Sequence, residues 1–303
     1  MKVEDILSGG YKRRHRRGPR KGRIRGIELA PIKLKEGGHM DGVGAIHISE
    51  IKPTLQRLER DLGIDLQNNV LGSVGKKEFS GDIDVAIHIK PEDFEKFKAQ
   101  VEKSSIVDDT VKGPLVLMSR VKIQGYNPDL ETDKNRTGYV QVDYMMDEDP
   151  EWLKTFYHAP SEKESRYKGA HRNIALGALS QFIDRKESEE KTPDGRPVEV
   201  ERYMFSSKLG LVRVIRRLKP RKDGKGYTKA WDNEVIDGPW KRGNEIAAEL
   251  NLGTAADLNS FETIFAAVEK NHGPDIAKKF ARAIAADQTI QDLGMPDEIE
   301  KYL

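Results

Sequence analysis

An alternating run of residues in the first half of the chain most constrains how this protein can fold. From residue 82 to residue 89 every second residue is Ile or Val, and Asp82 and Asp84 occupy two of the positions between them. Successive side chains of a β-strand point to opposite faces, so this run predicts a strand with one apolar face. Because Asp82 and Asp84 are two residues apart, both carboxylates project from the other face.

Helices and further strands on both sides of this run follow from the spacing of apolar residues. Helices are predicted over residues 49–63 and 91–103. Strands are predicted over residues 69–71, 115–123 and 138–145, with a polar loop over 126–136. The resulting order, α, β, β, α, β, β, predicts an α/β fold of the α+β type that is built on a mixed sheet.

The chain beyond about residue 150 has a different pattern, with helical spacing of apolar residues. Helices are predicted over residues 168–183 and 206–218 and again from residue 261 onward. The polar, glycine-rich stretch over 219–239 is interpreted either as a hairpin or as a mobile loop. We therefore expect a flexible arm over residues 1–40, a mixed-sheet domain over 41–155 and a mainly helical domain over 156–303.

The N-terminal arm is strongly basic. Residues 1–40 hold 12 Lys and Arg against 4 Asp and Glu, although the whole chain carries a net charge of only +2. The arm lacks apolar periodicity and is expected to be disordered by itself. Such an arm can bind nucleic acid through the release of counterions, or it can be a solubilising or localising tail. The residues predicted to contact nucleic acid are Arg13, Arg14, Arg16, Arg17, Arg20 and Lys21.

The composition limits the class of protein further. Apolar residues make up 37% of the 303 residues and charged residues 34%, which is typical of a globular protein with a charged surface. Cysteine is absent, so disulfides and thiolate zinc sites are excluded, and we expect a cytoplasmic protein. No apolar run approaches the length of a transmembrane helix, so membrane insertion is not expected.

A glycine–serine pair precedes the alternating strand and has a use of its own. Gly72 lets the backbone approach a ligand closely, and Ser73 offers a hydroxyl and an amide at a turn where phosphate oxygens are often bound. Lys76 and Lys77 can add positive charge there. These four residues are the predicted phosphate-binding end of the site.

Three carboxylates form the other end of the predicted site. Asp82 and Asp84 share one face of their strand, and Asp143 lies on the parity opposite to the apolar residues of a second strand. Carboxylate oxygens are the ligands that Mg²⁺ prefers, and three carboxylates can hold two such ions, with Mn²⁺ as an alternative. A pair of ions of this kind orients an attacking hydroxyl and stabilises a leaving pyrophosphate.

This set of residues resembles the polymerase-beta-type nucleotidyltransferase superfamily. Gly72 and Ser73 are followed after eight residues by Asp82 and Asp84, and Asp143 lies in the later segment YVQVDYM. The resemblance covers about a third of the chain and extends to compact phage-encoded members. It implies that Gly72 and Ser73 contact the β- and γ-phosphates, that Asp82 and Asp84 bridge both metal ions, and that Asp143 completes the catalytic metal site.

One position departs from the pattern of that superfamily, and one more distant lysine fits it. Where many members carry an Arg soon after Gly-Ser, this chain has Gly75, Lys76 and Lys77. Lys208, which follows Ser206 and Ser207 and precedes the apolar residues of the predicted helix, is expected to reach the triphosphate, as lysines of a second domain do in several members. The trio of His171, Arg172 and Asn173 either faces the nucleotide or forms a solvated helix face.

Together these features predict a magnesium-dependent nucleotidyltransferase in the cytoplasm of a bacterium or of a phage-infected host. It would transfer a nucleoside monophosphate from an NTP such as ATP to an acceptor hydroxyl and release pyrophosphate. The favoured acceptor is the 3′ end of RNA, because the basic arm can bind phosphates and so can a basic patch of Arg213, Arg216 and Arg217 on the helix predicted over 206–218, unless that patch is merely exposed. The alternatives are a protein or small-molecule acceptor, or a catalytically idle protein that binds nucleic acid or acts in assembly.

Overall fold

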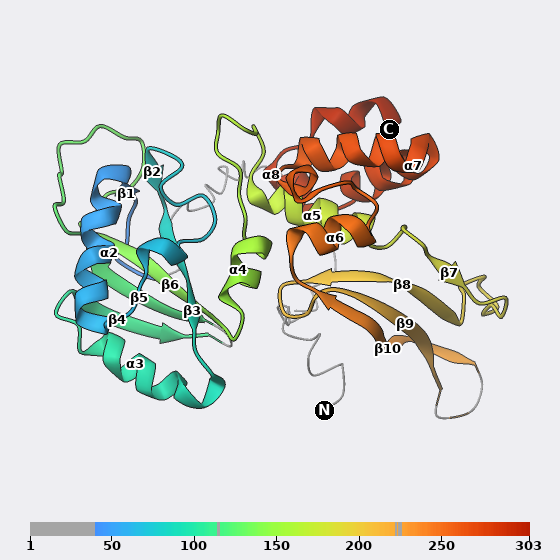
Figure 1. Ribbon diagram of the computed structural model, residues 1–303, viewed down its shortest axis with the longest axis horizontal. Helices are drawn as coiled ribbons and strands as arrows, with labels where there is room; N and C mark the ends of the chain where they lie inside the picture. Colours follow the sequence, from blue (N-terminus) through green and yellow to red (C-terminus); the bar gives the residue numbers. More distant parts are fainter. Residues whose placement is uncertain (1–39, 114–115, 222, 224–225) are drawn as a thin grey trace, which may run out of the picture.

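The structure is a computed structural model that describes residues 40–113, 116–221, 223 and 226–303 (Figure 1). The predicted basic arm, with Arg13, Arg14, Arg16, Arg17, Arg20 and Lys21, therefore lies outside the described residues apart from its last position. The chain has mixed α and β structure, with one mixed and two antiparallel sheets. This confirms the expected α+β class.

A four-stranded mixed sheet forms the core of the first part of the chain. Its strands lie in the order β3 (Asp82–His88), β6 (Tyr139–Asp147), β5 (Val116–Lys122) and β4 (Val107–Lys112). The pair of β3 and β6 is parallel, and the other neighbours are antiparallel. A separate two-stranded antiparallel sheet joins β1 (Ile46–His47) to β2 (Phe79–Ser80). The strands predicted over 82–89, 115–123 and 138–145 are thus confirmed.

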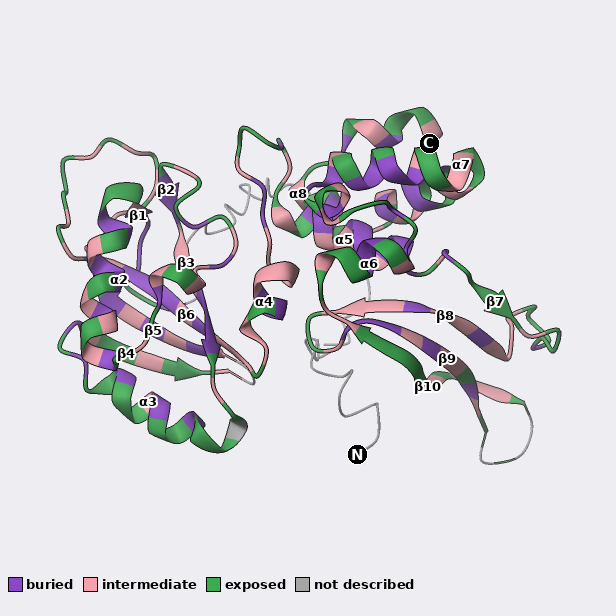
Figure 2. Ribbon diagram, viewed as in Figure 1, coloured by how far each residue is buried: buried purple, intermediate pink, exposed green. Residues whose placement is uncertain are grey.

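Helices α2 (Ile48–Leu62) and α3 (Phe94–Glu102) pack their apolar residues against this sheet. Figure 2 shows buried residues along β3, β5 and β6 beside these helices. The α2 helix ends where predicted, because Gly63 adopts a left-handed conformation at φ 67° and donates its N–H to the Glu59 carbonyl. The polar edge strand β4 has no alternating apolar pattern and was not predicted.

The second part of the chain combines helices with another sheet. The helices are α4 (Pro150–Phe156), α5 (Gly169–Leu179), α6 (Gly243–Glu249), α7 (Phe261–Ala285) and α8 (Gln288–Leu293). The sheet has the order β10 (Tyr227–Trp240), β9 (Gly210–Pro220), β8 (Glu199–Ser206) and β7 (Lys186–Glu187) and is antiparallel throughout. The cluster of buried residues here runs from Trp152 to Ile299, apart from the first cluster, which runs from Ile46 to Tyr144.

The helix predicted over residues 206–218 is wrong, since most of this segment is strand β9. Its apolar residues fit a helical spacing, but Val212 and Val214 are β-branched and buried in a strand that pairs with neighbours on both sides. The stretch over 219–239 provides most of β10 and forms a hairpin with β9, which confirms the first of its two interpretations. The expectation of a mainly helical second part is accordingly wrong over residues 186–240.

No helix among the described residues is long and apolar enough to cross a membrane.

Candidate active site

The parallel pairing of β3 with β6 brings the three predicted carboxylates to one face of the sheet. Asp84 lies opposite Asp143 in the register, and Asp82 lies opposite Gln141. The intervening residues, such as Ile83 and Val142, are fully buried on the other face. Strand parity therefore separates the acidic face from the apolar core, as the alternating sequence predicts.

The carboxylates on this acidic face repel one another when they are ionised, and, besides burial, this repulsion contributes to a raised pKa of Asp84. Burial, and then the negative charges of Asp82 and Asp143, raise the pKa of Asp84 to about 8. The Gln141 side chain donates a hydrogen bond of 2.7 Å from Nε2 to Oδ1 of Asp143 and so helps to orient that carboxylate. Close like charges in a partly buried place are typical of sites that bind a cation or perform chemistry.

The glycine–serine turn reaches this face because the preceding residues pair with β3. The strand predicted over 69–71 is reduced to one antiparallel bridge between Val70 and Val85, and the N–H of Leu71 donates to the carbonyl of Asp84 at 2.8 Å. Gly72 then turns with φ 64°, a conformation that favours glycine. A Cβ atom at Gly72 would lie 3.7 Å from Oδ2 of Asp84, so the turn lies directly beside this carboxylate.

The two lysines after the turn take different positions. The Lys77 side chain lines the same cleft as Asp82 and forms an ion pair with Glu162, with Nζ 3.3 Å from Oε1. Lys76 instead donates a hydrogen bond to the carbonyl of Ala159 and lines a smaller cavity, of about 260 Å³, on another side of Gly72. Burial lowers the pKa of Lys76. Of these two lysines, Lys77 is thus the one placed beside the carboxylates.

A cleft of about 740 Å³ lies over the carboxylates and has walls from both parts of the chain. One wall comes from the first part and includes Gly72, Ser73, Asp82 and Asp84. The other wall comes from the segment 157–173, which precedes and enters α5. Asp143 does not line the cleft, although it adjoins Asp84 in the sheet.

The second wall adds residues that sequence reasoning missed. Tyr157, Arg166 and Lys168 line the cleft from this wall, and Lys134, from the loop before β6, lines it from the first part of the chain. The pKa of the Tyr157 phenol is raised by burial and then by the charge of Asp84, which places this ring close to the carboxylates. No motif in the sequence marks these residues, because they meet the carboxylates only when the chain folds back over the sheet.

The structure separates the members of the His171–Asn173 trio. His171 and Arg172 are buried, and Arg172 donates hydrogen bonds to the carbonyls of Leu258 and Phe156. Asn173 lines the cleft. Lys208 is exposed in the turn between β8 and β9 and is not among the residues that line the cleft. Lys208 was predicted to precede an apolar helix, but the segment that follows it is strand β9.

The donor set fits a hard divalent cation. The described residues hold no group of three His, Asp or Glu side chains that is already arranged around a common ion position. The mutual repulsion that raises the pKa of Asp84 is nevertheless relieved by a cation between the carboxylates, and carboxylate oxygens are the ligands of Mg²⁺. Asp82, Asp84 and Asp143 are the residues that would hold it.

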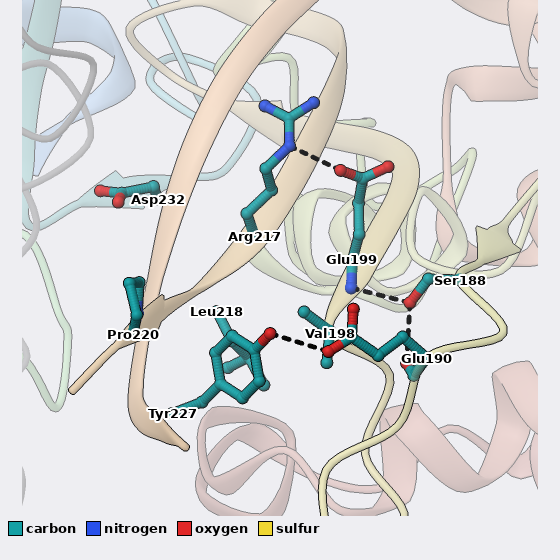
Figure 3. Close-up of a pocket in the computed structure, with 9 residues that line it drawn as sticks. All are labelled: Ser188, Glu190, Val198, Glu199, Arg217, Leu218, Pro220, Tyr227 and Asp232. Carbon is teal, nitrogen blue, oxygen red and sulfur yellow. Dashed lines mark hydrogen bonds and ion pairs between the residues drawn. The ribbon is translucent and has the colours of Figure 1, made fainter. Parts of the chain in front are cut away.

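A second cavity, of about 570 Å³, lies at the outer end of the sheet of β7 to β10 and has different chemistry (Figure 3). Several of its polar side chains are hydrogen-bonded to one another. Arg217 Nε donates to Glu199 Oε2 at 2.5 Å, and the Tyr227 hydroxyl donates to Glu190 Oε1 at 2.9 Å. The two glutamates are thus occupied by Arg217 and Tyr227, whereas Asp84 is buried and has two like charges beside it, which together raise its pKa, so the cleft over Asp82 and Asp84 is the better candidate for an active site.

Comparison of the chain with protein-family models gives no match, and comparison with curated proteins gives none either.

Proposed function

We propose that the protein is a metal-dependent nucleotidyltransferase of the polymerase-beta type. The observation that carries this proposal is the placement of Gly72 beside Asp84, with Asp82 and Asp143 on the same face of one mixed sheet. Transfer of a nucleotide requires a turn that binds the terminal phosphates and a set of carboxylates that binds the metal ions. Two Mg²⁺ ions bound by these carboxylates would neutralise the triphosphate and stabilise the leaving pyrophosphate.

The residues of the chain have distinct roles in this proposal. The backbone at Gly72 and the hydroxyl and amide of Ser73 bind the terminal phosphates, and Lys77 adds charge at the same end. Asp82 and Asp84 would hold the metal ions close to the α-phosphate. Asp143, which Gln141 orients, adjoins Asp84 in the sheet and would complete the metal site from there. The hydroxyl gives up its proton to solvent, its oxygen forms a bond to the α-phosphorus, the bond from that phosphorus to the bridging oxygen breaks, and pyrophosphate leaves.

The favoured acceptor is RNA, for which the basic composition of residues 1–40 is the supporting observation. A protein or a small molecule is the alternative acceptor within the same chemistry. A catalytically idle protein that binds nucleic acid is the alternative outside it.

One labelling experiment separates these possibilities. The purified full-length protein is incubated with Mg²⁺, each α-labelled NTP in turn and total RNA, and the products are separated by size. We expect label in RNA; label in protein or in small products identifies another acceptor, and no label indicates an idle protein. Asp82→Asn and Asp84→Asn should abolish the labelling, whereas Asp109→Asn, on the exposed edge strand β4, should not. Labelling that survives both active-site changes would refute the assignment of the site.

A further inference from the structure

The sheet of β7 to β10 separates its charges between its two faces. On the face that carries Tyr203 and Leu211, which belong to the core beneath the helices, arginines and lysines are paired with acids. These ion pairs are Arg213–Glu201, Arg217–Glu199, Arg217–Glu234 and Lys219–Asp232. The five acids of β8 to β10 all lie on this face by the strand register: Glu199, Glu201, Asp232, Glu234 and Asp237.

The opposite face carries two arginines that have no acidic partner among the described residues. Arg202 of β8 lies opposite Val214, and Arg216 of β9 lies opposite Val200, so the two arginines are diagonal neighbours on this face. Both valines are buried and form an apolar floor between the arginines. This face points away from the core that contains Tyr203, so it is separate from the packing of the helices.

The guanidinium groups are held in place without being neutralised. Arg216 donates from Nε to Oδ1 of Asn233 at 2.7 Å, and its guanidinium carbon lies 5.1 Å from the centre of the Trp231 ring. Arg202 has a buried Nε with no hydrogen-bond partner. Burial and then the positive charges of Arg216 and Arg185 lower the pKa of Arg202 to about 10. An arginine donor that is buried and unsatisfied, next to other positive charges, is stabilised by an anion.

One acid approaches this cluster from the edge strand. Glu187 of β7 accepts hydrogen bonds from Arg185 at 3.0 and 2.8 Å and forms an ion pair with Lys191 at 2.8 Å. Its charge is thus already shared by two cations and leaves Arg202 and Arg216 uncompensated. The cluster therefore keeps a net positive charge on this side of the sheet.

We propose that the sheet face formed by Arg202, Arg216 and Trp231 binds the phosphodiester backbone of an RNA strand. Guanidinium groups in fixed orientations form paired hydrogen bonds with phosphate oxygens, which a carboxylate-rich face cannot do. Trp231 is partly exposed and offers a ring on which a base can stack. The face is remote in the chain from Asp82 and Asp84, so this binding does not depend on the proposed transferase activity.

The test compares two pairs of substitutions in the full-length protein. Fluorescence anisotropy measures the affinity for a labelled single-stranded RNA of 20 nucleotides over a series of salt concentrations. For Arg202→Gln with Arg216→Gln we expect affinity to fall about tenfold and the slope of log K against log salt to decrease by about 1.4. The matched control, Arg213→Gln with Arg217→Gln, removes the same charge from the acid-paired face and should change affinity less than about twofold.

Three outcomes would overturn the proposal. The first is an equal loss of affinity in both double variants, and the second is no loss in either. The third is competition by poly-glutamate as effective as that by unlabelled RNA, which would identify the face as a surface for acidic proteins. If Arg202→Gln prevents folding, as shown by circular dichroism, Arg216→Gln alone is compared with Arg217→Gln alone; the first should lower affinity and decrease the salt slope by about 0.7, and equal effects of the two would overturn the proposal.

Discussion

Replacement of Asp84 by Asn should stabilise the metal-free protein, and the gain should grow with pH. Burial and the neighbouring carboxylates raise the pKa of Asp84 from 3.8 to about 8, so the folded state keeps a proton that the unfolded state loses near pH 4. Between these two pKa values the stability of the wild-type protein falls as pH rises, by about 1.4 kcal/mol per pH unit. Asn carries no titrating proton and escapes this loss, which totals about 5 kcal/mol by pH 8.

Urea unfolding in the presence of EDTA, followed by tryptophan fluorescence, measures this difference. From pH 5 to pH 7 the free energy of unfolding of Asp84→Asn should rise relative to wild type by about 2.7 kcal/mol. The control Asp109→Asn alters an exposed carboxylate and should show no such trend. Millimolar Mg²⁺ should reduce the difference, because a cation favours the ionised form of the three carboxylates. Equal differences at both pH values would refute the reasoning from burial and like charge.

Three further substitutions test other parts of the structure. Gly72→Ala places a side chain at φ 64° and beside Asp84, so it should cost about 1 kcal/mol and weaken NTP binding in calorimetric titration; unchanged affinity would contradict the role of the turn. Glu50→Gln removes a buried carboxylate that accepts two hydrogen bonds of 2.8 Å from Arg136, and urea unfolding should show a loss of about 3 to 5 kcal/mol; a loss below about 1 kcal/mol would show that the pair is not needed. Lys208→Gln should leave NTP affinity unchanged, because Lys208 does not line the cleft, and a tenfold loss would restore its predicted role.

Strands β3, β5 and β6 of the first sheet could be predicted because the sequence patterns that mark them involve adjacent residues. Alternation over 82–89 gives both the strand and the side on which Asp82 and Asp84 project, and the same parity rule places Asp143 with them. The helix boundary at Gly63 follows from a single residue that tolerates a left-handed conformation. In each case a few adjacent residues determine the outcome.

The second sheet and the far wall of the cleft were not predictable in this way. Strand β9 has apolar residues at a spacing that suits a helix as well, and pairing with β8 and β10 decides between the two. Tyr157 and Arg166 belong to a segment without a motif, and they acquire a place in the cleft only through contacts that are distant in sequence. Strand pairing and contacts between distant segments depend on the whole folded chain, so no short stretch of sequence predicts them.

The attachment of the Gly72 turn to the second wall of the cleft has a mechanical consequence. Gly72 forms a parallel bridge with His158, and Lys76 donates to the carbonyl of Ala159. The turn therefore belongs to the same hydrogen-bonded unit as the segment that leads into α5. Because the neighbouring Leu71 is also hydrogen-bonded to Asp84 of β3, the turn links the two walls, and a rotation of α5 away from the sheet would change the position of Gly72 relative to Asp84.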